Sequence, residues 1–565
     1  MRHWIGRCCD SHPGCSEPEP WTPSRLVDIG TDPLNPEPRL IETTTTTAHD
    51  DGGGDPRPRL LRYCALSHMW GDPSVLPPLR TLQANYAAFR ARLRMPDLPQ
   101  NFRDAVYVCA ALGIRYVWID SLCIVQDSPA DWAREAARMH LVYRHAVVTL
   151  VAASAVSSHD GFLRRDVSLA PCVKVRYSPV GEDSPEDADA EGRRGGTRTM
   201  ILSPRDPDDK GHRSRDVDES RWNSRGWTMQ ERSLSSRLLY FCRDKIYFEC
   251  RGAQWSEENE PQEALRGLFG LWPRDDANAA AAHPDGGGLS SADAGELYLQ
   301  WRAAVGEYSG RALSYAADKL VAIRSVAAEM ERRVVDDEYI ASAGMWYGDL
   351  PEELAWYVSA GSIASRPPRR RAPSWSWAAL DVRVGFANGT RATPLRADYA
   401  ELFARHPFAV VGLSAPELDT SSSLPPLPRL RLRGVTRPIR LMTKLVADDY
   451  WLPIERGLYM YDLAATNAAE GTGAGGAEEE TPVFAHGTLD LDNRDGVLSK
   501  GYRLLYLHVT YTSHPNGLIL AMPPSQGTEE VWERVGVATL FRLSGPPILD
   551  DSPQDCYRPT TVTVA

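Results

Sequence analysis

The segment of residues 63–154 constrains the fold most, because strand-like and helix-like runs alternate along it. Three apolar runs are typical of buried strands, at residues 63–67, 116–125 and 146–153. Between them, apolar residues recur at helical spacing. Strand, helix, strand, helix, strand at these lengths predicts an α/β domain: a small, doubly wound, mostly parallel sheet with helices packed on it.

Residues at the ends of the two helix-like runs predict where the helices begin and end. Asn101 is expected to cap the first helix, and Gly113 to end it in the left-handed conformation. Ser128 is expected to cap the second helix, with Asp131 completing a capping box. The buried face of this second helix is predicted to consist of Trp132, Ala136, Met139 and Tyr143.

The length of 565 residues predicts at least two domains. Four regions are expected: an N-terminal lead-in with a low-complexity linker at 1–62; the α/β domain at 63–232, with a polar insert at about 179–219; a helical or mixed region at 233–380; and a mixed α+β, partly β-rich region with flexible insertions at 381–565. Hairpin strands are expected within 237–250, and short strands near 430–433, 504–509 and 535–541.

The charge and the hydropathy of the sequence indicate in which cellular compartment the chain is expected. The formal net charge of -12 argues against binding to nucleic acid or to an anionic membrane surface. The sequence has neither an apolar signal region at its start nor an apolar run long enough for a membrane span. We therefore expect a cytoplasmic protein with reduced thiols, and nuclear residence stays open.

Three long sequence blocks occur in the same order as in one known family. They read YCALSHMWG at 63–71, LPQNFRDA continuing to LGIRYVWIDSLCIVQD at 98–127, and RGWTMQER at 225–232. In these blocks the chain closely resembles the fungal heterokaryon-incompatibility (HET) domain family. The polar insert between the second and third blocks departs from the family pattern.

The resemblance implies a role in self/non-self recognition, with programmed cell death after fusion of incompatible fungal cells or a related innate immune response. It also implies self-association and binding to other incompatibility proteins. It does not fix a reaction.

Polar residues that follow the first two predicted strands are candidate ligand contacts, since ligands bind beyond the carboxyl ends of parallel strands. Those after the first strand are Ser67, Trp70 and Gly71. Those after the second are Asp120, Cys123 and Gln126, of which Asp120 and Cys123 are also candidate catalytic residues. The third block adds Arg225, Trp227, Gln230 and Glu231, either as contacts to an anion or nucleotide or as a segment that only docks into the core.

A catalytic hypothesis centres on Glu135. The run DWARE at 131–135 resembles the Trp-x-x-Glu step of TIR domains, whose enzymatic members use this glutamate to cleave the nicotinamide–ribose bond of NAD. The resemblance implies a TIR-like domain with NAD as a candidate substrate and Glu135 as the carboxylate that stabilises an oxocarbenium-like state. The alternative is a solvated Glu135 that pairs with Arg134 or Arg138 on the helix surface.

A second catalytic hypothesis pairs Cys123 as a nucleophile with His68 as its base, because both are expected at strand ends. A small cysteine buried in an apolar strand is the commoner arrangement and is the favoured alternative.

Three residues near the start of the chain have a spacing suited to metal binding. Cys8, His12 and Cys15 offer three ligands on one short segment. A structural zinc site normally has four ligands, and no fourth lies nearby in the sequence, so simple packing of a terminal segment is favoured over zinc.

Two classes of function therefore stay open. The chain is either a non-enzymatic signalling module that acts through protein interactions, or an enzyme whose self-association switches on cleavage of a nucleotide.

Overall fold

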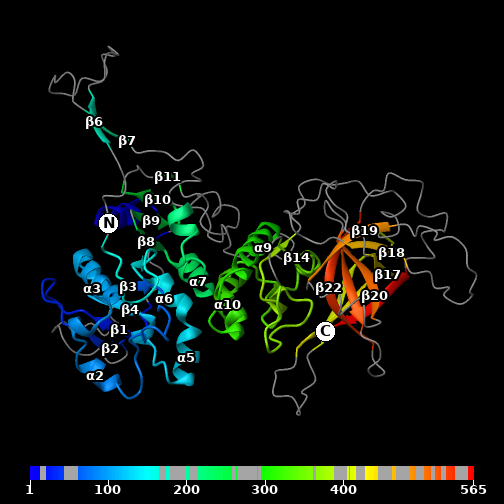
Figure 1. Cartoon of the computed structure of the whole chain (residues 1–565), viewed down its shortest axis with the longest axis horizontal. Helices are drawn as coiled ribbons and strands as arrows, with labels where there is room; N and C mark the ends of the chain where they lie inside the picture. Colours follow the sequence, from blue (N-terminus) through cyan, green and yellow to red (C-terminus); the bar gives the residue numbers. More distant parts are fainter. Residues whose placement is uncertain are drawn as a thin grey trace, which may run out of the picture. The chain divides into compact units, whose positions relative to one another are not determined.

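The structure is a computed structural model that describes residues 1–12, 15, 21–43, 61–164, 173–177, 198–202, 214–243, 245–257, 262–263, 289, 294–359, 364–386, 404–405, 407–414, 427–442, 461–465, 483–490, 502–510, 516–522, 530–540 and 558–565. The chain divides into two compact units (Figure 1). Unit 1 comprises Met1–Ser224 and Leu234–Leu265, and unit 2 comprises Arg225–Ser233 and Arg266–Ala565.

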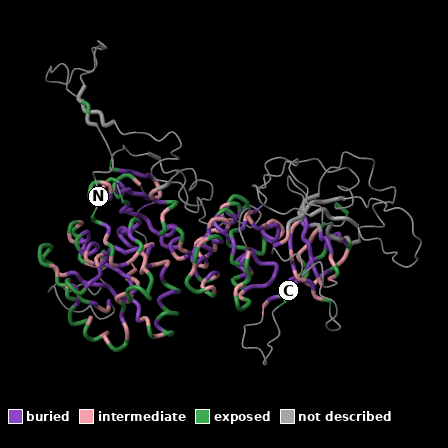
Figure 2. Tube along the Cα trace, in the orientation of Figure 1, coloured by how far each residue is buried: buried purple, intermediate pink, exposed green. Residues whose placement is uncertain are grey.

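Four parallel strands form the centre of unit 1. They are β3 (Tyr63–Ser67), β4 (Tyr116–Ile119), β5 (Val148–Val151) and β8 (Arg237–Phe241), and they pair in the order β4-β3-β5-β8. The three strands predicted from the alternating segment are therefore confirmed. All residues of β3, β5 and β8 are buried, as expected for strands that are covered on both faces (Figure 2).

Antiparallel strands extend this centre on both sides into a nine-stranded sheet. Beside β4 lie β1 (Arg25–Asp28) and β2 (Arg39–Glu42). Beside β8 lie β9 (Ile246–Cys250), β10 (Ala253–Ser256) and β11 (Gln262–Glu263). The prediction of a mostly parallel sheet is thus wrong. Strands β9, β10 and β11 follow β8 through short connections, which favour antiparallel pairing, and β1, which pairs with β2, runs antiparallel to β4.

Helices cover both faces of the central strands. The chain passes from β3 to β4 through α2 (Tyr86–Ala91), the short η3 (Met95–Asp97) and α3 (Gln100–Leu112). It returns across β3 to β5 through α5 (Pro129–Ala136) and α6 (Met139–His145). Right-handed connections that run in opposite directions place α3 on one face and the α5–α6 pair on the other (Figure 1).

The predicted helix ends are confirmed in two places and wrong in one. Gly113 ends α3 with φ of 76°, and Ser128 Oγ accepts a hydrogen bond from the Asp131 amide at 3.3 Å. However, α3 begins at Gln100 with Pro99 in the cap position, and Asn101 is a buried residue of its first turn. The Asn101 side chain does not cap the helix, because it binds a loop instead.

Two further predictions in this segment are wrong. Residues after β4 do not continue as a strand, because Asp120–Cys123 form a single helical turn, α4. Trp132 does not lie on the buried face, since 38% of its surface is exposed. Its neighbour Asp131 points inward to an arginine, and successive side chains on a helix diverge, so Trp132 points outward.

The remaining described elements of unit 1 are α1 (Arg2–Ser11), the β6–β7 pair (Val173–Tyr177 and Arg198–Leu202) and η5 (Ser214–Asp218). The rest of the predicted polar insert lies outside the described residues. No helix within the described ranges is long and apolar enough to cross a membrane.

Unit 2 begins with helices and small sheets around a tryptophan-rich core. Its elements up to residue 386 are α7 (Gly226–Leu234, whose last residue lies in unit 1), α9 (Gly295–Ser309), η6 (Ala316–Asp318), α10 (Lys319–Glu331), β12 (Tyr339–Ile340), β13 (Met345–Trp346), α11 (Leu350–Glu353), β14 (Trp356–Val358), η7 (Trp377–Ala379) and β15 (Val384–Phe386). The fully buried tryptophans are Trp301, Trp346, Trp356, Trp375 and Trp377.

An eight-stranded sheet follows in unit 2, and it confirms the strands predicted for the C-terminal region. Its strands are β16 (Ala409–Ser414), β17 (Arg429–Met442), β18 (Tyr461–Ala465), β19 (Val483–Leu489), β20 (Arg503–Thr510), β21 (Asn516–Met522), β22 (Val531–Leu540) and β23 (Arg558–Val564). The long strand β17 pairs with both β18 and β20, so the hydrogen-bonded ladder closes on itself.

Candidate functional site

The carboxyl ends of β3 and β5 form the point where ligands bind in many doubly wound sheets, because the connections leave these neighbouring strands in opposite directions. Here the loops that follow the two strands are joined to each other. Trp70 O accepts hydrogen bonds from Ser158 N at 3.3 Å and from Ser158 Oγ at 3.1 Å. A Cβ on Gly71, which has φ of +91°, would lie 2.7 Å from Ser157 Cβ. Gly71 therefore permits the close approach of the two loops.

Two polar residues of α3 fix the second of these loops. Asn101 donates to Ser157 O at 3.0 Å and accepts from Gly161 N at 2.9 Å. Asp104 Oδ2 accepts from Phe162 N at 2.7 Å and from Leu163 N at 3.1 Å. From the sequence, Asn101 was expected to cap the helix, and the role of both residues in the loop was missed. Their position on an otherwise apolar helix face was the available sign of a buried polar role.

Asp120 connects several of the predicted contact residues. Its Oδ2 accepts from the Trp70 indole at 2.9 Å, and its Oδ1 accepts from Ser121 N at 2.7 Å. His68 Nδ1 lies 4.0 Å from Asp120 Oδ1. The Gln126 amide donates to Asp120 O at 3.2 Å. The structure thus brings Trp70, Asp120 and Gln126 together, and each of their side chains is hydrogen-bonded to another group of the protein.

Ser67 lies at the end of β3, where it is buried. Its hydroxyl accepts a hydrogen bond from the Trp222 indole at 2.6 Å. The residue therefore links the end of the strand to the segment that precedes the third sequence block.

Cys123 is buried in the one-turn helix α4. Burial raises the pKa of its thiol to about 12, so the thiol stays protonated at neutral pH. His68, the base proposed for it, packs edge-on against Phe102 with ring centroids 5.2 Å apart. These surroundings favour the structural alternative over a thiolate nucleophile.

Arg25 of β1 lies at the centre of a buried ion-pair cluster, which we call the Arg25 cluster: Arg25, Asp131 and Glu135. Its Nη2 lies 2.5 Å from Asp131 Oδ2 and 3.7 Å from Glu135 Oε1. Its Nε donates to Cys123 O at 2.7 Å. Asp131 Oδ2 also accepts from the Val125 amide at 2.8 Å. One arginine thus joins β1 to α4 and α5.

The charges of the Arg25 cluster stabilise one another. Burial alone would raise the pKa of Asp131, but hydrogen bonds from Arg25 and from the Val125 amide outweigh it, so the pKa is lowered. Burial would lower the pKa of Arg25, and the hydrogen bond and charge of Asp131 outweigh that effect, so this pKa is raised. Both groups are therefore charged at neutral pH.

Glu135, the predicted catalytic residue, is 3% exposed. Besides Arg25, it binds Arg134, whose Nε lies 3.2 Å from Glu135 Oε1. The pairing with Arg134 was part of the structural alternative, although Glu135 is buried rather than solvated.

The third sequence block forms α7, whose residues up to Ser233 belong to unit 2. Trp227 donates from its indole to Asp318 Oδ2 at 3.3 Å and packs against the core of unit 2. Arg225 O accepts from Thr228 Oγ1 at 2.6 Å. Gln230 and Glu231 are buried. These contacts are those of a docking segment, which was one of the two alternatives for this block.

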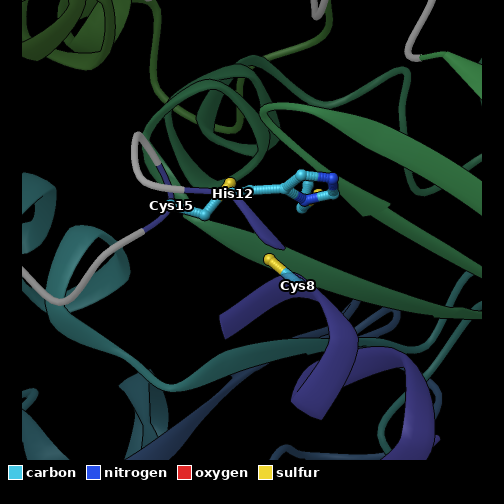
Figure 3. Close-up of side chains that lie close together, drawn as sticks. Cys8, His12 and Cys15 are labelled. Carbon is cyan, nitrogen blue, oxygen red and sulfur yellow. The ribbon is translucent and has the colours of Figure 1, made fainter. Parts of the chain in front are cut away.

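The three N-terminal candidates for metal binding, Cys8, His12 and Cys15, lie together in unit 1 (Figure 3). A fourth residue, Cys250, joins them from the end of β9. Sequence reasoning missed Cys250 because it lies 238 positions from His12.

Unit 1 is thus a mixed α/β domain in which the loops after β3 and β5 are hydrogen-bonded to each other at the usual ligand position. Comparison with known families identifies most of it: residues 63–231 match the family described as heterokaryon incompatibility protein (HET). The chain therefore carries a HET domain over these residues, and this domain implies a role in heterokaryon incompatibility. No curated protein and no solved structure matched the chain.

Proposed function

We propose that this protein promotes programmed cell death in an incompatibility response, and that its HET domain acts as a protein-interaction module rather than as an enzyme. The match of residues 63–231 to the HET family supports the first part. The second part rests on the surroundings of Glu135, the strongest candidate for catalysis.

A catalytic carboxylate must contact the substrate at the reacting atoms. The side chain of Glu135 is 4% exposed and lies beside the guanidinium groups of Arg25 and Arg134. The loops at the ends of β3 and β5 are also bonded to each other where a nucleotide would be expected. Both observations favour a structural role for these residues.

Exposed aromatic side chains on two helices of the HET domain support an interaction role. Tyr107 on α3 is 47% exposed and Trp132 on α5 is 38% exposed. Large aromatic residues supply much of the binding energy at protein interfaces. They are the first positions to test for self-association or for recruitment of another incompatibility protein in the cytoplasm.

The test is inducible expression of the full chain in fungal cells, with cell viability and NAD content measured together. Glu135→Gln keeps the shape of the side chain and removes its charge. Arg138→Gln is the matched control, since it changes an exposed residue three positions further on and leaves Arg25 and Arg134, the ion-pair partners of Glu135, in place. Circular dichroism and proteolysis of the purified variants verify the fold.

We expect the wild type and the folded Glu135→Gln variant to kill equally, with NAD unchanged before viability falls. Trp132→Ala should reduce killing together with self-association. NAD loss in the wild type that disappears in folded Glu135→Gln, along with killing, would overturn the proposal and establish NAD cleavage by a TIR-like mechanism.

A further inference from the structure

The cysteine cluster of unit 1 has the composition and geometry of a metal site. We propose a structural zinc(II) site whose four ligands are Cys8, His12, Cys15 and Cys250. The inference does not depend on the function proposed above, because it rests on the side chains of this cluster alone.

The geometry of the cluster suits a tetrahedral ion. The four ligand atoms all lie within 4.8 Å of one another, and Cys250 Sγ lies 3.3 Å from His12 Nδ1. Zinc bonds of about 2.3 Å to sulfur and about 2.0 Å to nitrogen place neighbouring ligand atoms roughly 3.5–3.8 Å apart. Three thiols and one imidazole are also the soft donor set that selects zinc over calcium or magnesium.

Local structure brings the ligands to one point. Cys8 and His12 lie four residues apart at the end of α1, and the His12 amide donates to Cys8 O at 3.1 Å. The Cys15 amide donates to His12 O at 3.0 Å. Cys250 ends β9, at the turn into β10. The end of α1, Cys15 and the β9–β10 hairpin thus converge on the same position, and Figure 3 shows Cys8, His12 and Cys15 side by side.

Groups around the cluster suit bound thiolates. The buried Arg237 lies with its Nε 3.3 Å from Cys8 Sγ, and its Nη2 donates to Cys15 O at 2.6 Å. Three thiolates on one zinc ion leave a net negative charge, which this guanidinium would balance. The Ala253 amide donates to Cys250 Sγ at 3.3 Å. Amide donors of this kind stabilise sulfur that carries negative charge.

Gly252 allows the imidazole to reach the cluster. A Cβ at this position would lie 3.0 Å from two carbon atoms of the His12 ring. A side chain here would therefore displace the ring, so the hairpin turn is shaped to accept His12.

Few residues of α1, the helix that carries Cys8 and ends just before His12, are buried. Only Ile5 and Cys8 are buried among the ten residues of α1. Isolated helices of this length are marginal in water, and two buried residues add little apolar contact. A zinc ion would fasten α1 to the β9–β10 hairpin near the edge of the nine-stranded sheet.

The experiment measures zinc in the full-length protein, purified without chelator under a phosphine reductant, by mass spectrometry of the metal. We expect about one zinc per chain in the wild type, as a four-ligand site requires. Cys250→Ser should lose it. Cys9→Ser is the matched control, since Cys9 lies on the same helix but is exposed, and it should retain full zinc content. Cys250→His, which replaces one zinc ligand by another, should recover most of it.

Cobalt(II) supplies a second readout that needs no variant. Cobalt added to the reduced, zinc-depleted wild type should give thiolate-to-cobalt charge-transfer bands and the strong visible bands of tetrahedral coordination. Zinc should bleach these bands. No metal after reconstitution, an octahedral cobalt spectrum, or a Cys250→Ser variant that keeps its zinc would overturn the proposal.

Discussion

The Arg25 cluster and the cysteine cluster both join the N-terminal segment to distant parts of unit 1, but with different chemistry. In the Arg25 cluster, one cation lies among two carboxylates and a carbonyl oxygen, so opposite charges are already present. In the cysteine cluster, the four side chains offer lone pairs to a common point. Neutral thiols are poor hydrogen-bond partners, so they stabilise each other little. The first cluster is complete as folded, and the second needs an ion.

This difference predicts how each cluster fails. Removing one member of a buried ion pair leaves an uncompensated charge, so the Arg25 cluster should be sensitive to substitution and indifferent to chelators. The cysteine cluster should respond to both. Different parts of one chain can unfold locally with different free energies, which amide hydrogen exchange measures peptide by peptide. For the Arg25 cluster, the peptides of β3, β4 and β5 report this free energy of local opening.

The largest loss of stability is expected for Arg25→Met. This change removes the buried cation between Asp131 and Glu135 and leaves them only the half-exposed Arg134 as a partner. We expect the free energy of opening of the sheet to fall by about 3–5 kcal/mol. Arg39→Met is the control on the neighbouring strand, where the arginine side chain is 54% exposed and lies 3.5 Å from Asp28. Its loss should cost less than about 1 kcal/mol.

A combined variant separates charge from packing in this cluster. Adding Asp131→Asn and Glu135→Gln to Arg25→Met removes the two buried negative charges that have lost Arg25, so part of the lost stability should return. Equal protection of the Arg25→Met variant and the wild type would show that the cluster contributes nothing.

The sequence was informative where interactions are local, and silent where they join distant segments. The existence of β3, β4 and β5 followed from residues 63–154 alone, and the end of α3 followed from Gly113. The partner of Asp131 could not be found this way, since Arg25 lies 106 positions away. Cys250 was out of reach for the same reason. No periodicity records contacts of this kind, because they form only once the sheet is assembled.

The exposure of Trp132 shows how one long-range contact overrides a local pattern. Apolar spacing placed this tryptophan on the buried face of its helix. The pairing of Asp131 and Glu135 with Arg25 instead turns the carboxylates inward, and Trp132 is 38% exposed as a result. Sequence patterns cannot weigh a buried ion pair against a tryptophan when the partner strand is unknown.

The second-largest change in stability is expected on removal of zinc from the cysteine cluster. At a free zinc concentration one hundred times the dissociation constant, binding should stabilise the zinc-bound fold by about 2.7 kcal/mol. Chelation should therefore increase hydrogen exchange in α1 and in the β9–β10 hairpin, and should expose the N-terminal helix to proteases. Cys250→Ser should show the same exchange with and without chelator. A chelator effect of equal size in wild type and Cys250→Ser would contradict a role for this cluster.

The loss of stability expected at Asp104 is smaller than that at the Arg25 cluster. Asp104 is a buried carboxylate that accepts hydrogen bonds from backbone amides rather than from an arginine. Asp104→Asn preserves the size of the side chain and removes the charge that strengthens the bonds from Phe162 N and Leu163 N. We expect a loss of about 2 kcal/mol, read as faster exchange in the 157–163 loop. Asp97→Asn is the control, because the Asp97 side chain is 63% exposed. Slower exchange in Asp104→Asn would contradict this role.

The smallest expected change in stability is its dependence on pH. This dependence separates what the charges of the Arg25 cluster contribute from what its packing contributes. The pKa of Asp131 is lowered in the folded protein, so the folded state binds its proton less readily than the unfolded chain. The stabilisation is therefore complete above the unfolded pKa of about 4 and is lost as the pH falls through the folded value. The difference in opening free energy between wild type and Asp131→Asn should stay constant from about pH 5 to 8 and shrink below about pH 4. A difference that stays constant into acid would mean that Asp131 acts through its shape and its hydrogen bond to Val125, and not through its charge.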